Sequence, residues 1–144
     1  MTTVSSSPRV LANTSGKVAG ALLLVVVGFQ MALAAGAPWG AAAFGGQQTG
    51  VLPDELRVTS AVVAVSYLFL AVAAASRLIA TRVRRPLMYG AAALMAVGFI
   101  LNVASPSLIE RLLWAPVTIA LVLAFWQAAR SSRSTACADS RLIA

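Results

Sequence analysis

Four stretches of the chain are free of charged residues for long enough to cross a membrane, and polar or charged segments separate them. These apolar stretches cover residues 18–37, 58–76, 87–104 and 112–129. At about 1.5 Å per helical residue, each reaches nearly or fully across the roughly 30 Å of bilayer hydrocarbon. The pattern predicts an all-α integral membrane four-helix bundle, built from two helical hairpins.

Local signals mark where three of these helices begin. Pro53-Asp54-Glu55 precedes the second apolar stretch, and Pro86 precedes the third. Proline is tolerated in the first turn of a helix, where acidic residues also complement the helix dipole. Before the fourth stretch, Ser107 and Glu110 have the spacing of a capping box, in which each side chain accepts a hydrogen bond from the other residue's backbone N–H. We therefore expect structural roles for Asp54 and Glu55 at the second helix and for Glu110 at the fourth.

The basic turn from Ser76 to Pro86 orients the predicted bundle. Short loops rich in Lys and Arg stay on the cytoplasmic side of a membrane. With this turn inside, Arg57 and Arg111 lie outside and the other nine of the eleven basic residues lie inside. Both termini are then predicted to be cytoplasmic. The inside set is Arg9, Lys17, Arg77, Arg82, Arg84, Arg85, Arg130, Arg133 and Arg141.

The two ends of the chain are more polar than the region between them. We expect residues 1–16 to form a flexible cytoplasmic N-terminus, 17–130 the four-span domain, and 131–144 a disordered basic tail. An alternative is that the first stretch is a cleaved signal peptide, since Ala32-Leu33-Ala34 matches a cleavage pattern behind a basic start. The length of the apolar run and its Gln30 favour a retained helix.

Composition places the chain among membrane proteins and removes several kinds of chemistry. Hydrophobic residues make up 60% of the chain and charged residues only 10%, with a net charge of +7. The basic residues flank apolar runs, so we expect the lipid bilayer and no nucleic acid as a partner. Cys137 is the single cysteine and histidine is absent. We therefore expect no disulfide, metal or cofactor.

Polar residues within the spans are the candidates for a ligand site. Unpaired polar groups are costly in hydrocarbon, so these side chains should face other helices or a cavity. If they converge, they form an outward-facing polar pocket. The alternative is interhelical hydrogen bonding that contributes roughly 0.6 kcal/mol per bond. The candidates are Gln30, Ser66, Tyr67, Asn102 and Thr118.

A second group of polar and aromatic residues gathers on the predicted outer side. It is a candidate interface for a lipid headgroup, another membrane protein or a second copy of the chain. The alternative is that these residues are helix caps, interfacial anchors and solvated ion pairs, which contribute little as exposed pairs. The group comprises Trp39, Asp54, Arg57, Glu110, Arg111 and Trp114.

Short motifs around the outer loops resemble those of small four-span membrane proteins of high-GC Gram-positive bacteria. The resemblance implies a four-helix membrane fold and a multi-pass location in the bacterial plasma membrane, and it implies no particular activity. The motifs are Gly36-Ala37-Pro38-Trp39-Gly40, Leu52-Pro53, Leu56-Arg57-Val58, Asn102, Ser105-Pro106-Ser107, Glu110-Arg111 and Trp114-Ala115-Pro116.

These observations favour a non-enzymatic membrane protein that binds a partner or lipid through its outer half. The alternative is a small transporter or channel component that uses the polar pocket. Better-known four-span families fit poorly: small multidrug exporters need a carboxylate in the first span, and thiol oxidoreductases need paired cysteines. An enzyme acting through Asp54 or Glu110 is disfavoured because both residues have structural roles.

The predicted orientation can be tested with reporter fusions in a bacterial host. A fluorescent protein fused after Ala144 should fluoresce, and alkaline phosphatase at the same position should be inactive, because both report a cytoplasmic C-terminus. Alkaline phosphatase inserted after Gln48 should be active and serves as the matched control. An active phosphatase after Ala144 would contradict the orientation.

Overall fold

The computed structural model of the chain is all-α over the residues that it describes. These are residues 8–76 and 79–142, with side chains described within 14–76, 79–80 and 82–130. The four helices are α1 (Pro8–Ala34), α2 (Asp54–Ala75), α3 (Thr81–Ala104) and α4 (Leu108–Leu142). Two single-turn 3-10 helices, η1 (Gly40–Ala42) and η2 (Phe44–Gly46), lie in the connection between α1 and α2.

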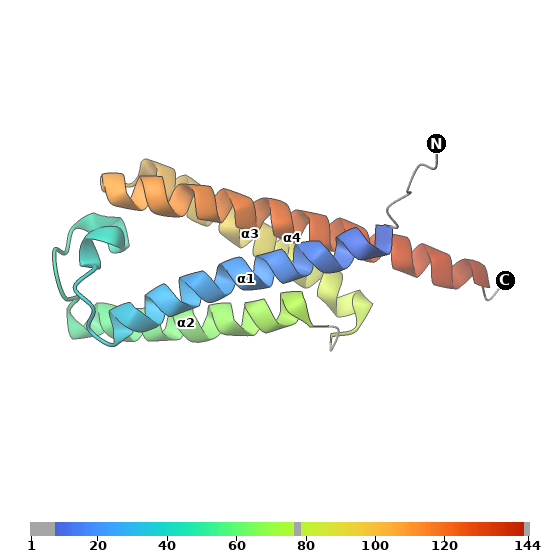
Figure 1. Ribbon diagram of the computed structural model, residues 1–144, viewed down its shortest axis with the longest axis horizontal. Coiled ribbons are helices and arrows are strands. Elements are labelled where there is room, and N and C mark those ends of the chain that lie inside the picture. The colour runs from blue at the N-terminus through green and yellow to red at the C-terminus, as the bar shows by residue number, and fades with distance from the viewer. Residues whose placement is uncertain (1–7, 77–78, 143–144) are drawn as a thin grey trace, which may run out of the picture.

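The four helices form two antiparallel hairpins, α1 with α2 and α3 with α4 (Figure 1). The hairpins join mainly through α1 and α4, whereas α2 and α3 share few contacts in the described part of the chain. The α1–α2 connection and the α3–α4 turn lie at one end of the bundle, here called the loop end. The start of α1, the α2–α3 turn and the end of α4 lie at the opposite end, here called the terminal end. The predicted four-helix bundle of two hairpins is confirmed.

Each helix contains a segment long and apolar enough to span a membrane. These segments are Thr14–Ala34, Asp54–Ala75, Arg82–Ala104 and Leu108–Arg130. Only 22% to 28% of the residues in their most apolar windows are buried inside the protein. The remaining apolar surface needs lipid around it, because soluble proteins rarely expose large continuous apolar surfaces. The chain is a small multi-pass integral membrane protein.

The apolar core has two parts along the bundle. The larger part lies toward the terminal end, where all four helices meet around fully buried residues such as Leu23, Met88 and Phe125. The smaller part lies at the loop end and consists of Leu33, Ala43 and Leu52, with Phe29 and Leu56 packed against it. The smaller part thus depends on the α1–α2 connection, which contributes Ala43 and Leu52.

Close contact between α1 and α2 depends on two glycines of α1. A Cβ atom on Gly16 would lie 2.5 Å from the carbonyl oxygen of Ala74, and one on Gly20 would lie 3.1 Å from the Cβ of Ala75. Small residues allow backbones to approach closely in membranes, where dispersion contacts replace the hydrophobic driving force. These glycines therefore set the distance between the two helices near the terminal end.

The first helix ends three residues before the predicted boundary at Ala37. Gly36 has a φ of +97°, which suits glycine because it lacks a Cβ. The N–H of Gly36 donates to Leu33 O, and that of Ala37 donates to Ala32 O. This is a Schellman motif, which satisfies the last carbonyls of a helix and ends it.

Helices α1 and α4 extend beyond the predicted spans at the two ends of the chain. Helix α1 already begins at Pro8, within the predicted flexible segment 1–16, and α4 continues to Leu142, through most of the predicted disordered tail. Pro8 suits a first helical position. The segment 131–142 contains neither Pro nor Gly to end the helix. Met1 to Ser7 lie outside the described residues.

The predicted basic turn from Ser76 to Pro86 is shorter than expected. Helix α3 begins at Thr81, so Pro86 lies inside the helix and the prediction that it opens the helix is wrong. The backbone N–H groups of Val83 and Arg84 donate to Ala80 O, which starts the helix ahead of the proline. Pro86 then removes one bond, to the carbonyl of Arg82. Arg77 lies outside the described residues.

Two glycine-to-alanine substitutions in α1 should have opposite effects on stability. Gly16→Ala forces Ala74 away and should destabilise the bundle by about 1–3 kcal/mol. Gly28→Ala meets no atom within 4 Å and should stabilise it by up to about 1 kcal/mol, through helix propensity. Unfolding of the detergent-solubilised protein measures both. If the two substitutions change the free energy of unfolding equally, α1 and α2 are not in close contact at Gly16.

Candidate functional site

The connection between α1 and α2, residues 35–53, folds into a compact structure that we call the loop cap. A hydrogen bond of 3.0 Å from the N–H of Gly40 to Gly50 O closes the middle part of this segment. Gly45, Gly46 and Gly50 have positive φ values of 78°, 67° and 94°. Glycine adopts this region at little cost, so the glycine-rich sequence permits two tight turns within a short segment. The loop cap is thus a defined structure with its own backbone hydrogen bonds.

The loop cap is fastened to the first turns of α4. Ser107 Oγ donates to Ala41 O at 2.8 Å, and Trp114 Nε1 donates to Ala42 O at 2.8 Å. Gly46 lies so close to α4 that a Cβ there would be 2.5 Å from the Cβ of Ser107. These contacts join residues 66 and 72 positions apart in the sequence. The loop cap therefore links the two hairpins at the loop end.

An aromatic cluster lies beneath the loop cap. Phe29 of α1 stacks on Trp39 with ring centroids 6.1 Å apart, and it meets Trp114 at 4.5 Å in a tilted arrangement. Such aromatic pairs contribute about 0.5–1.5 kcal/mol beyond their buried area. Trp114 is half-buried, whereas Trp39 keeps 50% of its surface exposed. Of these two tryptophans, Trp39 is the one available for an outside contact.

Glu110 lies in a hydrogen-bond network at the start of α4. Ser107 Oγ accepts from the N–H of Glu110 at 3.3 Å, as the capping-box spacing predicts. The reverse bond is different: Ser105 Oγ donates to the Glu110 carboxylate and accepts from the N–H of Ser107 at 3.1 Å. Glu110 is only 8% exposed. Its carboxylate is therefore a structural acceptor, buried beside a serine that sequence reasoning did not single out.

Arg57 closes the C-terminal end of α1. Its Nε donates to Ala34 O at 3.1 Å, and its Nη1 pairs with Asp54 Oδ1 at 3.1 Å. A cation beside the last carbonyls of a helix is favoured by the helix dipole. The side chain of Asp54 is 94% exposed, so the pair itself contributes little. Arg57 therefore joins α2 to the end of α1 at the loop end.

An apolar surface remains exposed at the loop end. Of the loop-cap residues, Trp39, Phe44 and Val51 are 50%, 37% and 54% exposed. At the start of α4, Leu108 is 62% exposed, and Arg111 is exposed nearby in sequence. We call this set of five residues the loop-end surface. Three of the five belong to the loop cap, whose backbone hydrogen bonds hold it in place.

The structure brings together only part of the predicted polar pocket. Asn102 Nδ2 donates to Thr118 Oγ1 in a long hydrogen bond of 3.5 Å between α3 and α4. Gln30 belongs to the other hairpin, and its Oε1 is buried without a hydrogen-bond partner among the described residues. Ser66 is exposed and donates to Val62 O of its own helix. Tyr67 is half-buried and packs against the larger core.

Ser60 is a buried polar residue that sequence reasoning did not single out. It is fully buried, and its Oγ has no hydrogen-bond partner in the part of the chain that the structure describes. The contact between Arg57 and Ala34 sets the antiparallel register of α1 and α2, and this register places Ser60 near the level of Gln30. Period-3.6 spacing could have shown that Ser60 and Ala64 share a face. The composition of the helix gave no sign that this face is the buried one.

Neither metal ligands nor known relatives suggest a function. Among the residues that the structure describes, no group of three or more His, Cys, Asp or Glu side chains could hold a metal ion. Comparison with protein-family models, curated proteins and solved structures finds no match for the chain. Candidate functions therefore depend on the residues themselves.

Two serine-to-alanine substitutions test how the buried hydroxyls are satisfied. Ser105→Ala removes a donor to a buried carboxylate and should destabilise the protein by about 1–3 kcal/mol. Ser60→Ala removes a buried hydroxyl without a partner and should stabilise the protein by about 1 kcal/mol or more. Unfolding midpoints in detergent compare the two directly. A destabilised Ser60→Ala would show that this hydroxyl has a partner, such as a bound water.

Proposed function

We propose that this chain is a non-enzymatic membrane protein that binds another integral membrane protein through its loop-end surface. The observation that carries the proposal is the exposure of Trp39, Phe44 and Val51 on a loop whose backbone is hydrogen-bonded in place. Neither part of the apolar core includes these three side chains. They form a suitable contact for an apolar partner.

Preorganisation supports this proposal. Binding costs free energy when loops must be ordered, and a loop that is already held in one conformation avoids most of that cost. The loop cap is held from within by the Gly40–Gly50 bond, and from outside by Ser107, just before α4, and Trp114 of α4. Aromatic residues also dominate binding energy at protein interfaces. Trp39 and Phe44 are the expected anchors.

A non-enzymatic role is supported by the positions of the acidic groups. Glu110 is buried and accepts a hydrogen bond from Ser105, and Asp54 is exposed at the surface and pairs with Arg57. A catalytic carboxylate needs a concave site where a substrate can reach it. Both carboxylates instead accept hydrogen bonds from side chains near the helix starts.

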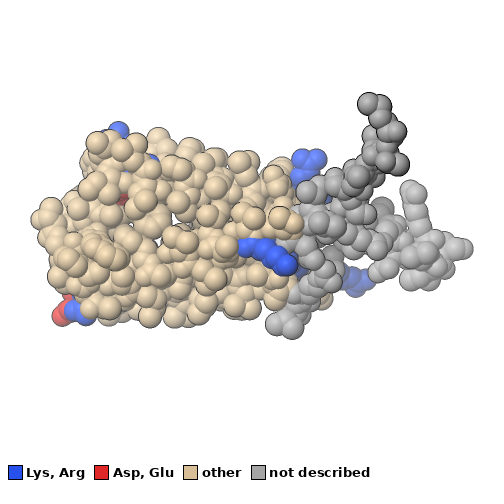
Figure 2. Space-filling model, in the orientation of Figure 1, with Lys and Arg blue, Asp and Glu red and all other residues tan. Residues whose placement is uncertain are grey.

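The proposed location is the bacterial plasma membrane, with both termini in the cytoplasm. Lys17 lies near the start of the first span, Arg82 starts the third and Arg130 ends the fourth, and these span ends belong to the terminal end. Loops rich in Lys and Arg are retained on the cytoplasmic side, which supports this location. Figure 2 shows basic residues close to that end of the protein and a broad uncharged surface beside them. The loop-end surface would then face away from the cytoplasm.

Site-specific photocrosslinking in native membranes tests the proposed contact. Phe44→p-benzoylphenylalanine should give a discrete crosslinked product with a protein partner, and its mass separates another chain from a second copy. Phe69→p-benzoylphenylalanine is the matched control, because Phe69 is a 64% exposed phenylalanine on the lipid-facing side of α2. It should crosslink to lipid only.

A second substitution separates binding from proximity. Trp39→Ala removes a proposed anchor and should lower the yield of the Phe44 product about tenfold, the loss expected for an interface hot spot. Val65→Ala on α2, an exposed residue of the lipid-facing surface, should leave the yield unchanged. A product of equal yield from both photoreactive positions would contradict the proposal.

A second candidate function is a small transporter or channel component. It is favoured by the buried polar atoms Gln30 Oε1 and Ser60 Oγ, which a bound water or polar solute would satisfy. Figure 2 shows the protein face hollowed between the two hairpins toward the loop end. Destabilisation by Ser60→Ala, in the unfolding comparison described above, would support this candidate over a dry, close-packed interior.

A further inference from the structure

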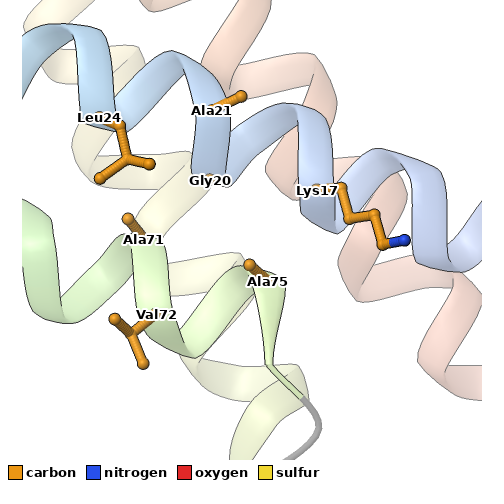
Figure 3. Close-up of a pocket in the computed structure, with 7 residues that line it drawn as sticks. All are labelled: Lys17, Gly20, Ala21, Leu24, Ala71, Val72 and Ala75. Carbon is orange, nitrogen blue, oxygen red and sulfur yellow. The ribbon is translucent and has the colours of Figure 1, made fainter.

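An apolar groove of about 280 Å³ runs between α1 and α2 near the terminal end. It is lined by Lys17, Gly20, Ala21, Leu24, Ala71, Val72 and Ala75 (Figure 3). The groove exists because four of these side chains are no larger than a methyl group, whereas Leu24 and Val72 extend from the two helices. Gly20 closes the floor, since a Cβ there would lie 3.1 Å from the Cβ of Ala75.

The groove opens to the lipid-facing surface of the bundle. Leu24 and Val72 are 54% and 50% exposed, and Ala21 and Ala75 are also exposed. Its volume lies just below the roughly 300–1,000 Å³ of pockets that enclose compact small molecules. A narrow, linear apolar group that enters from the bilayer fits this shape. An acyl chain of a lipid is such a group.

Lys17 gives the groove a charged end. In Figure 3 its aliphatic part lies at the groove margin and its ammonium points away from the apolar lining, beyond Ala75. A lysine at a membrane boundary packs its stem on apolar surface and keeps the charge near the headgroups. An acyl chain lying in the groove would therefore have its headgroup beside this ammonium.

The surrounding charge favours an anionic headgroup. Arg84 Nη2 lies 3.1 Å from the position that a Cβ of Gly16 would take, so a second cation lies next to the backbone that precedes Lys17. The acidic residues Asp54, Glu55 and Glu110 are at the opposite end, at the starts of α2 and α4. Asp139, the fourth acidic residue, comes after Arg130, where the last span ends.

We infer that this groove holds an anionic phospholipid, with one acyl chain between α1 and α2 and its phosphate beside Lys17. The inference concerns a different end of the protein from the proposed partner contact and does not depend on it. Such a lipid would pack against the close α1–α2 contact and fill a hollow that the protein leaves open. The lipid belongs to the leaflet at the terminal end.

Native mass spectrometry of the full-length protein in mild detergent tests this inference. The probes are phosphatidylglycerol and phosphatidylcholine with identical acyl chains. Phosphatidylglycerol should form a one-to-one adduct that survives collisional activation sufficient to remove phosphatidylcholine. Equal retention of both lipids would overturn the inference, as would a dimer in place of the lipid adduct.

Two pairs of variants assign the adduct to the groove. Lys17→Gln should weaken phosphatidylglycerol binding about fivefold, the factor that corresponds to about 1 kcal/mol for one basic residue near an anionic surface. Arg130→Gln, at an exposed residue where the α4 span ends and outside the groove lining, should leave it unchanged. Ala21→Phe should fill the groove and abolish the preference for phosphatidylglycerol over phosphatidylcholine. Ala93→Phe, at an exposed alanine of α3, should leave this preference unchanged.

The charge variants keep the test decisive if Ala21→Phe fails to fold. Lys17 and Arg130 are both exposed, so neither substitution removes a buried contact. Equal adduct stability in Lys17→Gln and Arg130→Gln would overturn the assignment to the groove.

Discussion

The constraint that governs this structure is the need to satisfy backbone polar groups at helix ends that lie near hydrocarbon. Within a bilayer each unsatisfied N–H or C=O costs several kcal/mol, and helices satisfy all but their terminal groups. Arginine side chains supply two of the missing donors: Arg57 Nε donates to Ala34 O, and Arg84 Nη2 donates to Ala74 O. Each arginine also connects neighbouring helices, so closing a helix end positions the next element.

The same constraint explains why the loop cap has a defined shape. A segment of irregular backbone beside the membrane must bond internally or to a neighbour, and the loop cap does both. Its carbonyls at Ala41 and Ala42 accept from Ser107, which directly precedes α4, and from Trp114 of α4. These bonds hold the two hairpins together at the loop end, where the buried residues of the smaller core are Leu33, Ala43 and Leu52. The fold and the candidate contact surface thus depend on the same hydrogen bonds.

The sequence predicted the spans well because hydrocarbon thickness acts on composition and length alone, whatever surrounds each helix. It predicted boundaries less well: Pro86 is tolerated inside α3 because the helix already starts with bonds to Ala80 O. Single residues depended on tertiary contacts that span the chain. Ser66 and Ser60 both lie in α2, yet only packing decides that the first is exposed and the second buried. For the same reason, Ser105 as partner of Glu110 could not be derived from the capping-box spacing.

The loop-end surface differs in kind from the apolar surface along the spans. Side chains such as Val65 and Phe69 are 67% and 64% exposed on α2, and the surrounding lipid accounts for them completely. The bilayer does not account in the same way for Phe44. In the part of the chain that the structure describes, Phe44 is the one non-glycine residue with a positive φ, at 52°. A left-handed conformation is uncommon for an aromatic residue and costs free energy of order 1–3 kcal/mol. The loop cap holds Phe44 in this conformation with its side chain partly exposed, which is the expected arrangement for a side chain that is presented to a partner.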